Sequence, residues 1–340
     1  MLNRSALGFV ALTLALMGCG AAPPGQVASV VVIDPPRASA TVPPRDEAPP
    51  RSSCIQGEWC VETVPPGVEG SLKSIWGTGP TDVYAVGEKA ILHHDGHAWK
   101  REAVELARPD DGFSSVWGSS ATDVWAASVY GNIYRREGGH WALNRRGEDQ
   151  LQQIWGTGPN DIYVVGGTTD AKNVEGVVLH FDGKTWTRDL VANYQLMAIG
   201  GLGPHDWVAA GWGPTLVVGG ASGRKLVTTP GSPNFMAVWA QGGRIYLGDW
   251  TQGVSRWRGA ELDLIREDDG ASGLWGTGDD LYAVNWGRIG HYDGKTWTTL
   301  KLGEADYREL YAVWGASGHV FIAGSGATIL HKWPRAASAL

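Results

Sequence analysis

The chain has 340 residues, and its 28 Lys and Arg against 35 Asp and Glu give a formal net charge of −7. A mildly acidic chain with scattered charges lacks the basic surface that nucleic-acid binding requires, so no nucleic-acid partner is expected. Beyond the first residues, no segment is long and apolar enough to cross a bilayer as a helix.

The first residues have the layout of an export signal. Arg4 supplies a positive charge, and the uncharged run 7–17 is as long as a signal-peptide core and too short for a transmembrane helix. The motif Leu16-Met17-Gly18-Cys19 resembles a bacterial lipobox, although Met17 departs from the small residue usual there. The resemblance implies removal of residues 1–18 and lipidation of Cys19, with palmitate among its acyl chains. The alternative is an ordinary signal peptide with an incidental cysteine. Gly20, where an Asp would resemble an inner-membrane retention signal, favours the outer membrane.

Residues 19–53 are predicted to be a linker, because they are rich in Pro and Ala and carry little to bury. Pro-rich chains stay extended, so this linker should hold the rest of the chain away from the membrane. Cys54 and Cys60 follow as an even pair in an oxidising compartment, and we expect them to form a disulfide. Two free thiols are the alternative.

The remaining chain, 54–340, repeats itself around a Trp-Gly step, as in Ser74-Ile75-Trp76-Gly77. The marker positions recur at intervals of 36 to 45 residues: Trp76, Trp117, Trp155, Gly200, Trp239, Trp275 and Trp314. Each repeat reads as four short strands, A to D, with strand B typified by the alternating run 82–87. This period and content predict an all-β, seven-bladed β-propeller of four-stranded blades.

The ends of the array predict how the ring closes. The seventh repeat stops after its third strand, near Lys332, whereas residues 57–65 before the first repeat read as a fourth strand. This N-terminal strand should complete the last blade, which removes an open sheet edge. A Cys54–Cys60 disulfide would brace it.

Eleven tryptophans are assigned to packing because they fill positions that most blades share. Those at the end of strand A are Trp76, Trp117, Trp155, Trp239, Trp275 and Trp314, and those in strand D are Trp59, Trp99, Trp141, Trp186 and Trp297. The strand C histidines His93, His180, His291 and His331 could be metal ligands. One histidine per blade keeps them apart, however, so structural hydrogen bonding is expected, with no metal site and no cofactor.

The run from Ile75 to Gly87 resembles propeller repeats of secreted bacterial proteins, over residues 57–333. Two further propeller classes are similar in places. Asp182-Gly183-Lys184-Thr185-Trp186 and the matching run 293–297 look like the Asp-box of sialidase-type propellers, but are one residue short and lack its Ser. An Asp-box is a structural turn, so this likeness does not imply hydrolysis. The run 281–294 is loosely similar to a tectonin repeat, a class that binds sugars.

The candidate site is a column of residues that differ between blades. It lies after strand B and reads Glu88, Val129, Gly167, Trp212, Trp250, Trp286 and Ser325. Three successive blades carry Trp, and Tyr130 lies one place beyond the column in the second blade. Trp212, Trp250, Trp286 and Tyr130 are therefore predicted to form an aromatic binding platform at the channel mouth, which the loop 168–175 could rim. The alternative is that these rings fill space left by weaker packing in blades four and five.

Catalysis has weaker support, and no catalytic residue is assigned. Acids occur in the loops between strands D and A: Asp110, Asp111, Glu148, Asp149, Asp268, Asp269 and Asp306. Arginines that a sialidase-like site would need also lie in such loops: Arg145, Arg146, Arg266 and Arg308. Nothing in the sequence shows that they converge.

The expected function is therefore that of a monomeric cell-envelope lipoprotein that binds a glycan, a peptide or a protein partner. Its only contact with the membrane would be the lipid anchor. A glycan-active hydrolase or lyase is the alternative, and a structural scaffold without a small ligand is the third reading.

Overall fold

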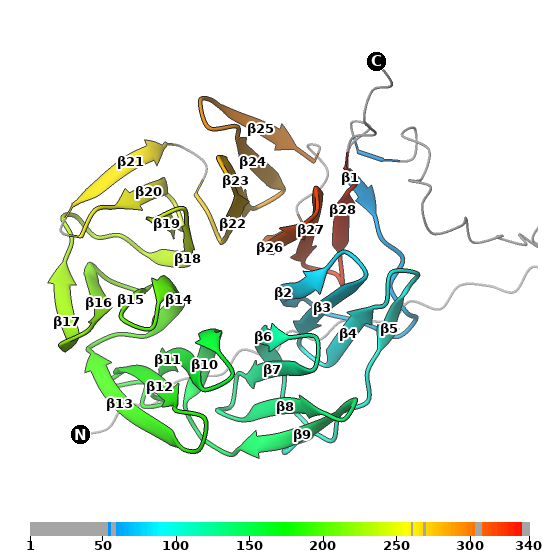
Figure 1. Cartoon of the computed structure of the whole chain (residues 1–340), viewed down its shortest axis with the longest axis horizontal. Coiled ribbons are helices and arrows are strands. Elements are labelled where there is room, and N and C mark those ends of the chain that lie inside the picture. Colours follow the sequence, from blue (N-terminus) through cyan, green and yellow to red (C-terminus); the bar gives the residue numbers. More distant parts are fainter. Residues whose placement is uncertain (1–53, 56–58, 260, 268–269, 303–307, 335–340) are drawn as a thin grey trace, which may run out of the picture. The chain divides into compact units, whose positions relative to one another are not determined.

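The computed structural model describes residues 54–334 except 56–58, 260, 268–269 and 303–307. The predicted leader, the linker and Cys19 lie outside the described residues. The described chain is all-β, and seven four-stranded antiparallel sheets form a ring (Figure 1). This is the seven-bladed β-propeller that the repeats predict. No helix in the described part of the chain is long and apolar enough to span a membrane.

Each blade runs outward from the central channel as strands A, B, C and D. Blades one to three comprise β2 (Leu72–Gly79), β3 (Asp82–Gly87), β4 (Ala90–His94), β5 (Trp99–Arg101), β6 (Phe113–Ser120), β7 (Asp123–Ser128), β8 (Ile133–Glu137), β9 (His140–Arg145), β10 (Gln150–Gly158), β11 (Asp161–Gly167), β12 (Gly176–Phe181) and β13 (Trp186–Ala192). Blades four and five comprise β14 (Leu196–Gly203), β15 (Asp206–Gly211), β16 (Thr215–Gly220), β17 (Gly223–Thr228), β18 (Phe235–Gln241), β19 (Arg244–Asp249), β20 (Gly253–Trp257) and β21 (Leu262–Arg266). Blades six and seven comprise β22 (Gly273–Thr277), β23 (Asp280–Asn285), β24 (Arg288–Tyr292), β25 (Trp297–Lys301), β26 (Leu310–Ala316), β27 (His319–Gly324), β28 (Ile329–Lys332) and β1 (Trp59–Val61).

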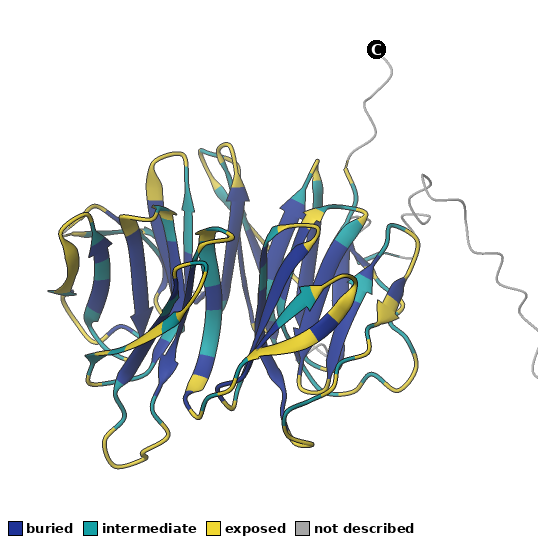
Figure 2. Ribbon diagram, turned by 60° about the horizontal axis from the view of Figure 1, so that its bottom comes forward, coloured by how far each residue is buried: buried dark blue, intermediate teal, exposed yellow. Residues whose placement is uncertain are grey.

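The core consists of layers between neighbouring sheets. Side chains of a strand alternate between its two faces, so each strand B supplies both adjacent layers. In β3, Val83 and Ala85 pack against blade seven, whereas Tyr84 and Val86 pack against blade two. The B strands are accordingly buried along most of their length, and exposed residues gather in the loops and outer strands (Figure 2).

The Trp-Gly step has a direct packing explanation. The indole of one blade lies on the glycine of the next, and a Cβ added to Gly118 would stand 2.5 Å from the Trp76 ring. The same contact joins Trp117 to Gly156, Trp275 to Gly315 and Trp314 to Gly77. We call blades six, seven, one, two and three, which these contacts link, the regular arc. Blades four and five, where the sequence lacks the Trp-Gly step, form the irregular arc.

The packing role predicted for the eleven tryptophans is confirmed, because all of them pack in or against the hydrophobic core, but they differ in burial. Trp59, Trp99, Trp141, Trp275 and Trp314 are buried. The other six, Trp76, Trp117, Trp155, Trp186, Trp239 and Trp297, are only half-buried. The strand A rings line the central cavity whether they are half-buried, as Trp76 is, or buried, as Trp275 and Trp314 are.

The N-terminal strand closes the ring as predicted. β1 pairs antiparallel with β28, with Trp59 opposite Lys332 and Val61 opposite Leu330. Trp59 is 2% exposed and meets the Tyr282 ring of blade six edge to face. The expected disulfide joins Cys54 to Cys60 with Cα atoms 4.2 Å apart, at the start of the closing strand.

The turns that resemble an Asp-box are structural, as expected. Asp182 Oδ1 accepts backbone N–H bonds from Lys184 at 2.8 Å and Thr185 at 2.7 Å. Asp293 makes the same two bonds to Lys295 and Thr296 in blade six. These bonds hold the tight turn between strands C and D, far from the channel strands.

Candidate functional site

A ring of side chains surrounds one end of the central channel, and β-bulges put it there. In six blades the pairing of strands A and B shifts by one residue near the start of strand A, as between Leu72 and Ser74. A bulge leaves one residue unpaired and redirects its side chain. The bulged residues are Lys73, Ser114, Gln152, Met197, Met236 and Tyr311, and Ser272 takes the same place in blade six. We call these seven residues the rim.

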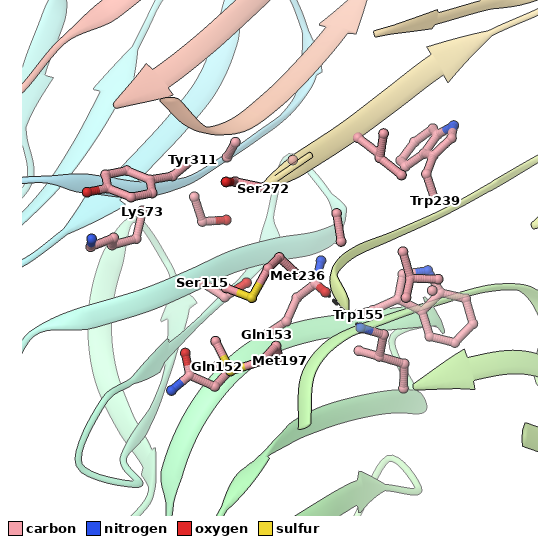
Figure 3. A pocket seen from close by; sticks show the side chains of 18 of the residues that line it. Lys73, Ser115, Gln152, Gln153, Trp155, Met197, Met236, Trp239, Ser272 and Tyr311 are labelled. Carbon is pink, nitrogen blue, oxygen red and sulfur yellow. Dashed lines mark hydrogen bonds between the residues drawn. The ribbon is translucent and has the colours of Figure 1, made fainter. Parts of the chain in front are cut away.

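The rim stands over a cavity of about 550 Å³ that runs into the channel. Figure 3 shows Lys73 and Tyr311 side by side at one end of it, and Trp155 and Trp239 toward the other. Between them lies a belt of buried aliphatic side chains that also line the cavity: Ile75, Val116, Ile154, Ile199, Val238, Leu274 and Val313. The cavity therefore has a varied, partly polar rim and an apolar interior, and its size is that of a small-ligand site.

One side of the rim is polar and lies where blades seven and one meet. The Lys73 ammonium sits 3.6 Å above the Tyr311 ring, and the Tyr311 hydroxyl donates to Glu309. Burial lowers the pKa of Lys73, while the charges of Glu309 and Glu88 oppose that shift. Burial, with the Glu309 bond, raises the pKa of Tyr311 to about 12. This side therefore presents an amine, a phenol and two acidic side chains to the cavity mouth.

The opposite side of the rim is apolar and belongs to the irregular arc. Met197 and Met236, both half-buried, stand in neighbouring blades and line the cavity together with Trp250. Trp250 is held through its backbone, because its N–H donates to Asn234 at 2.9 Å and its carbonyl accepts from Asn285 at 3.3 Å. This side therefore joins one fixed indole to two flexible thioethers.

The predicted platform residues lie in the loops that follow strands B. Because strand B ends where strand A begins, these loops stand at the same end of the channel as the rim. Trp250 and Trp286 meet edge to face, with ring centroids 5.0 Å apart. Trp212 and Trp286 are 45% and 52% exposed. Tyr130 is apart from them, in blade two, with the Arg108 guanidinium 4.2 Å above its ring.

Sequence reasoning missed the rim itself. Its signal was present in the column three residues before each Trp-Gly marker, which reads Lys, Ser, Gln, Met, Met, Ser and Tyr. The preceding residue is buried and apolar in every blade. The column beside it varies from blade to blade, which indicates that its side chains have no packing role shared by all blades. The bulge that turns these side chains into the channel cannot be read from hydrophobic alternation.

The loop acids and arginines considered for catalysis serve mainly as braces where they are described. Asp111 is fully buried and accepts bonds from Asn132 and Tyr134. Asp149 is buried and pairs with Arg188 at 2.7 Å. Arg145 donates to the Gly131 carbonyl, and Arg266 lies over the Trp297 ring in blade six. Asp268, Asp269 and Asp306 lie outside the described residues.

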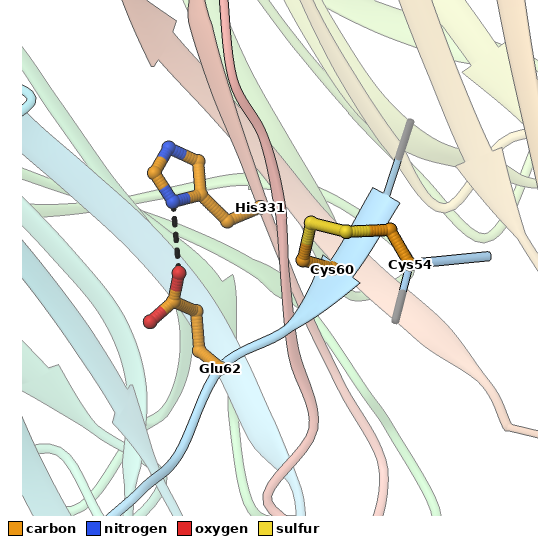
Figure 4. Close-up of a disulfide and its surroundings, with 4 residues drawn as sticks. All are labelled: Cys54, Cys60, Glu62 and His331. Atoms are coloured by element: carbon orange, nitrogen blue, oxygen red, sulfur yellow. Dashed lines mark hydrogen bonds and ion pairs between the residues drawn. A yellow bond between two sulfur atoms is a disulfide. The ribbon is translucent and has the colours of Figure 1, made fainter. Parts of the chain in front are cut away.

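The strand C histidines make the hydrogen bonds expected of structural residues. His93, His180 and His291 each bond an aspartate of strand B, at 2.8 to 2.9 Å, and each stacks on a tyrosine. In blade seven His331 bonds Glu62 at 2.8 Å, next to the disulfide-braced strand (Figure 4). In the described residues no group of three His, Cys, Asp or Glu side chains is placed to hold a metal ion.

Comparison with known proteins places the fold but not the family. No family model and no curated protein matches the chain. YCF48 from Cyanidioschyzon merolae is 17% identical, with a TM-score of 0.63 over 82% of this chain and 100% of that one. YCF48 bound to D1 peptide gives 14% identity and a TM-score of 0.63, covering 84% and 97%. Catalytically inactive virginiamycin B lyase from Staphylococcus aureus with quinupristin gives 13% and 0.67, covering 81% and 99%. At these identities the likeness shows that the chain is a β-propeller distantly similar to binding proteins and to a lyase.

Proposed function

We propose that this protein is an exported, lipid-anchored component of the cell envelope whose propeller binds a glycan, peptide or protein partner at the channel mouth. One observation carries the binding function. Six bulges and the equivalent position of blade six present seven side chains to a single cavity, and these side chains differ between blades although the strands behind them repeat. A fold that needs only packing at these positions has no reason to vary them, whereas a binding surface does.

The exposed indoles of Trp212 and Trp286 extend this surface beyond the cavity. Trp250 connects the two parts, because it lines the cavity and also touches Trp286. The predicted aromatic platform thus becomes the outer part of a larger mouth, with the rim as its inner part. Tyr130 belongs to the same end of the channel, two blades away from Trp212.

Binding at the mouth is tested with the chain 19–340 carrying Cys19→Ser, which is free of lipid. Glycan and peptide arrays should yield ligands whose affinity falls about tenfold or more in the double variant Lys73→Ala/Gln152→Ala. The exposed outer-strand change Lys225→Ala serves as the matched control and should leave affinity unchanged. Ligands that bind the parent, the double variant and the control variant equally would contradict a site at the mouth.

The anchor is proposed from the leader sequence and from the oxidising compartment that the Cys54–Cys60 bond suggests. Cells expressing the wild type should incorporate labelled palmitate and retain the protein in outer-membrane fractions. Cys19→Ser should lose both, whereas Cys54→Ser/Cys60→Ser should keep the label. Equal labelling of the wild type and Cys19→Ser would remove the anchor from the proposal.

A second candidate function is bond cleavage in a bound ligand. It is favoured by the structural likeness to a lyase and by the adjacent titratable side chains of Lys73, Glu309 and Tyr311. The variant that inactivates that lyase replaces a histidine, and the described residues that line this cavity include none. Array ligands incubated with the protein and analysed by mass spectrometry distinguish the two functions, since a binding protein returns every ligand intact.

A further inference from the structure

We infer that the ligand at the mouth is a segment of a protein chain that inserts one large apolar side chain between Met197, Met236 and Trp250. This inference rests on the proposed binding function and selects one of the ligand classes that the function leaves open. It is carried by the placement of the methionines, by the polarity of the cavity and by the hydrogen-bonding groups of the rim.

Both methionines of the propeller lie at the cavity. The chain has four, and Met1 and Met17 fall in the predicted leader. The only two in the propeller occupy equivalent bulge positions in adjacent blades, half-buried at the edge of the same cavity. A methionine side chain is flexible and polarisable, so it adapts to apolar groups of different shapes and is common at surfaces that bind peptides.

The interior of the cavity favours an apolar side chain over a sugar ring. Directly below Met197 and Met236 lie Ile199 and Val238, both buried and aliphatic. A sugar that packed against these two side chains would bring hydroxyl groups to aliphatic surface that cannot hydrogen-bond them, which is unfavourable. A large apolar side chain gives up no hydrogen bonds on entering the cavity, and the removal of its surface from water is favourable.

Polar groups on the rim suit a peptide backbone: Lys73 and Glu309 lie across the cavity from the methionines, and Gln152 lies in blade three beside Met197 (Figure 3). Within the described residues, neither the Lys73 ammonium nor the Gln152 amide hydrogen-bonds another side chain, so both keep donors for a ligand carbonyl. Glu309 accepts from Tyr311 and retains lone pairs for a ligand N–H. A backbone offers a carbonyl and an N–H side by side, which is the combination that these three residues can satisfy.

The wall beside the methionines is rigid, which gives the inserted side chain a fixed reference. Asp249 accepts the backbone N–H groups of Thr251 and Gln252 at 2.8 and 2.7 Å and holds the loop that carries Trp250. The Trp286 ring supports the Trp250 indole edge to face. A rigid aromatic surface facing two adaptable thioethers is the arrangement expected of a pocket that accepts several apolar residues.

The test uses short random peptides displayed on phage and selected against the chain 19–340 carrying Cys19→Ser. Methionines labelled with 13C in their methyl groups report from within the site, because Met197 and Met236 are the only two in that chain. Selected peptides should share a large apolar residue and should move both methyl signals. Replacing that residue by Ala in the peptide should weaken binding about tenfold or more, equivalent to about 1.4 kcal/mol or more.

Three variants separate the methionines from general surface effects. Met197→Gln/Met236→Gln should weaken peptide binding about tenfold. Met197→Leu/Met236→Leu keeps the wall apolar and should bind within about threefold of the parent. Leu226→Gln removes an apolar side chain that is 58% exposed on β17 and should change nothing. Equal thermal stability of all three confirms that binding alone is compared.

The outcomes distinguish this inference from the proposed function. Peptides that bind without moving the methyl signals, or unaffected by the Gln variant, overturn the inference and leave binding elsewhere on the mouth. A glycan that moves both signals when no peptide does overturns the inference and keeps the function. If neither peptides nor glycans bind, both fail.

Discussion

The regular and irregular arcs join their blades by different means. In blades one to three, Ser74, Ser115 and Gln153 each accept a backbone N–H from the next blade, at 2.7 to 3.2 Å. In blades four and five the equivalent residues are Ala198 and Ala237, which have no such acceptor. Gly273 and Ala312 of blades six and seven lack it too, so only the Trp-Gly contacts separate the two arcs, and the arc without those contacts carries Met197 and Met236 on the rim. The residues that repeat between blades are therefore those that pack one blade on the next. The blades that lack the repeated Trp-Gly step are those that form the apolar side of the mouth.

The largest effect is expected where the regular arc closes. Trp59 is almost fully buried between blades six and seven, so Trp59→Ala should lower the free energy of unfolding by about 3–5 kcal/mol. Deleting residues 54–65 should cost more, because it also exposes the edge of β28. Urea unfolding followed by tryptophan fluorescence gives both values. A truncated chain that unfolds at the parent's urea concentration would contradict closure by β1.

A matched pair of glycines tests the contact that defines the two arcs. A Cβ at Gly118 would stand 2.5 Å from the Trp76 ring and 2.7 Å from the Asp123 carbonyl, whereas one at Gly200 would meet nothing closer than 3.0 Å. Gly118→Ala should therefore destabilise the protein by about 1–3 kcal/mol. Gly200→Ala should cost less than about 1 kcal/mol. Equal midpoints of thermal unfolding for the two variants would show that Trp-on-Gly packing does not distinguish the arcs.

The contrast between the arcs also explains what sequence alone could predict. The seven blades and the closing strand followed from repeats, because packing imposes the same residues on every blade, whereas the Cys54–Cys60 bond followed from an even pair of cysteines in an expected oxidising compartment. Trp212, Trp250 and Trp286 were found as departures from a column, and whether they bind a ligand stays a prediction. The rim was missed because a bulge at Met197 or Lys73 changes the direction of a side chain without changing the hydrophobic pattern around it.

Acid should weaken the closure at a position where blade seven departs from its neighbours. In blades one, three and six the strand C histidine bonds an aspartate, but in blade seven His319 takes the place of that aspartate, and its Nδ1 lies 2.9 Å from His331 Nε2. Burial, with the nearby His331 and His94, lowers the pKa of His319 from 6.5 to about 4. The unfolded chain therefore takes up a proton first, and stability that is complete above pH 6.5 is lost as the pH falls toward 4.

The expected loss for His319 is about 1 kcal/mol, less than the full shift would give because its side chain is half-exposed. His319→Asp restores the pairing of blades one, three and six and should remove this part of the acid sensitivity. Unfolding free energies of both proteins at pH 7 and pH 5 provide the comparison. An identical decline in the two would assign the acid sensitivity to other groups.

The smallest effect on stability is expected in the irregular arc, at Trp212. Its side chain is 45% exposed, and the bond that fixes the loop, from its N–H to the Gln195 carbonyl at 3.1 Å, comes from the backbone and survives truncation. Trp212→Ala should thus change the free energy of unfolding by less than about 0.5 kcal/mol. If the exposed indole belongs to the binding surface, the same variant should bind the ligands selected from the arrays more weakly while its melting temperature stays constant.

Trp59→Ala is the control and should give the pattern expected of a packing residue, with a large loss of stability. A Trp212→Ala variant that melts as early as Trp59→Ala would assign this ring to packing and confine the binding surface to the rim, Trp250 and Trp286.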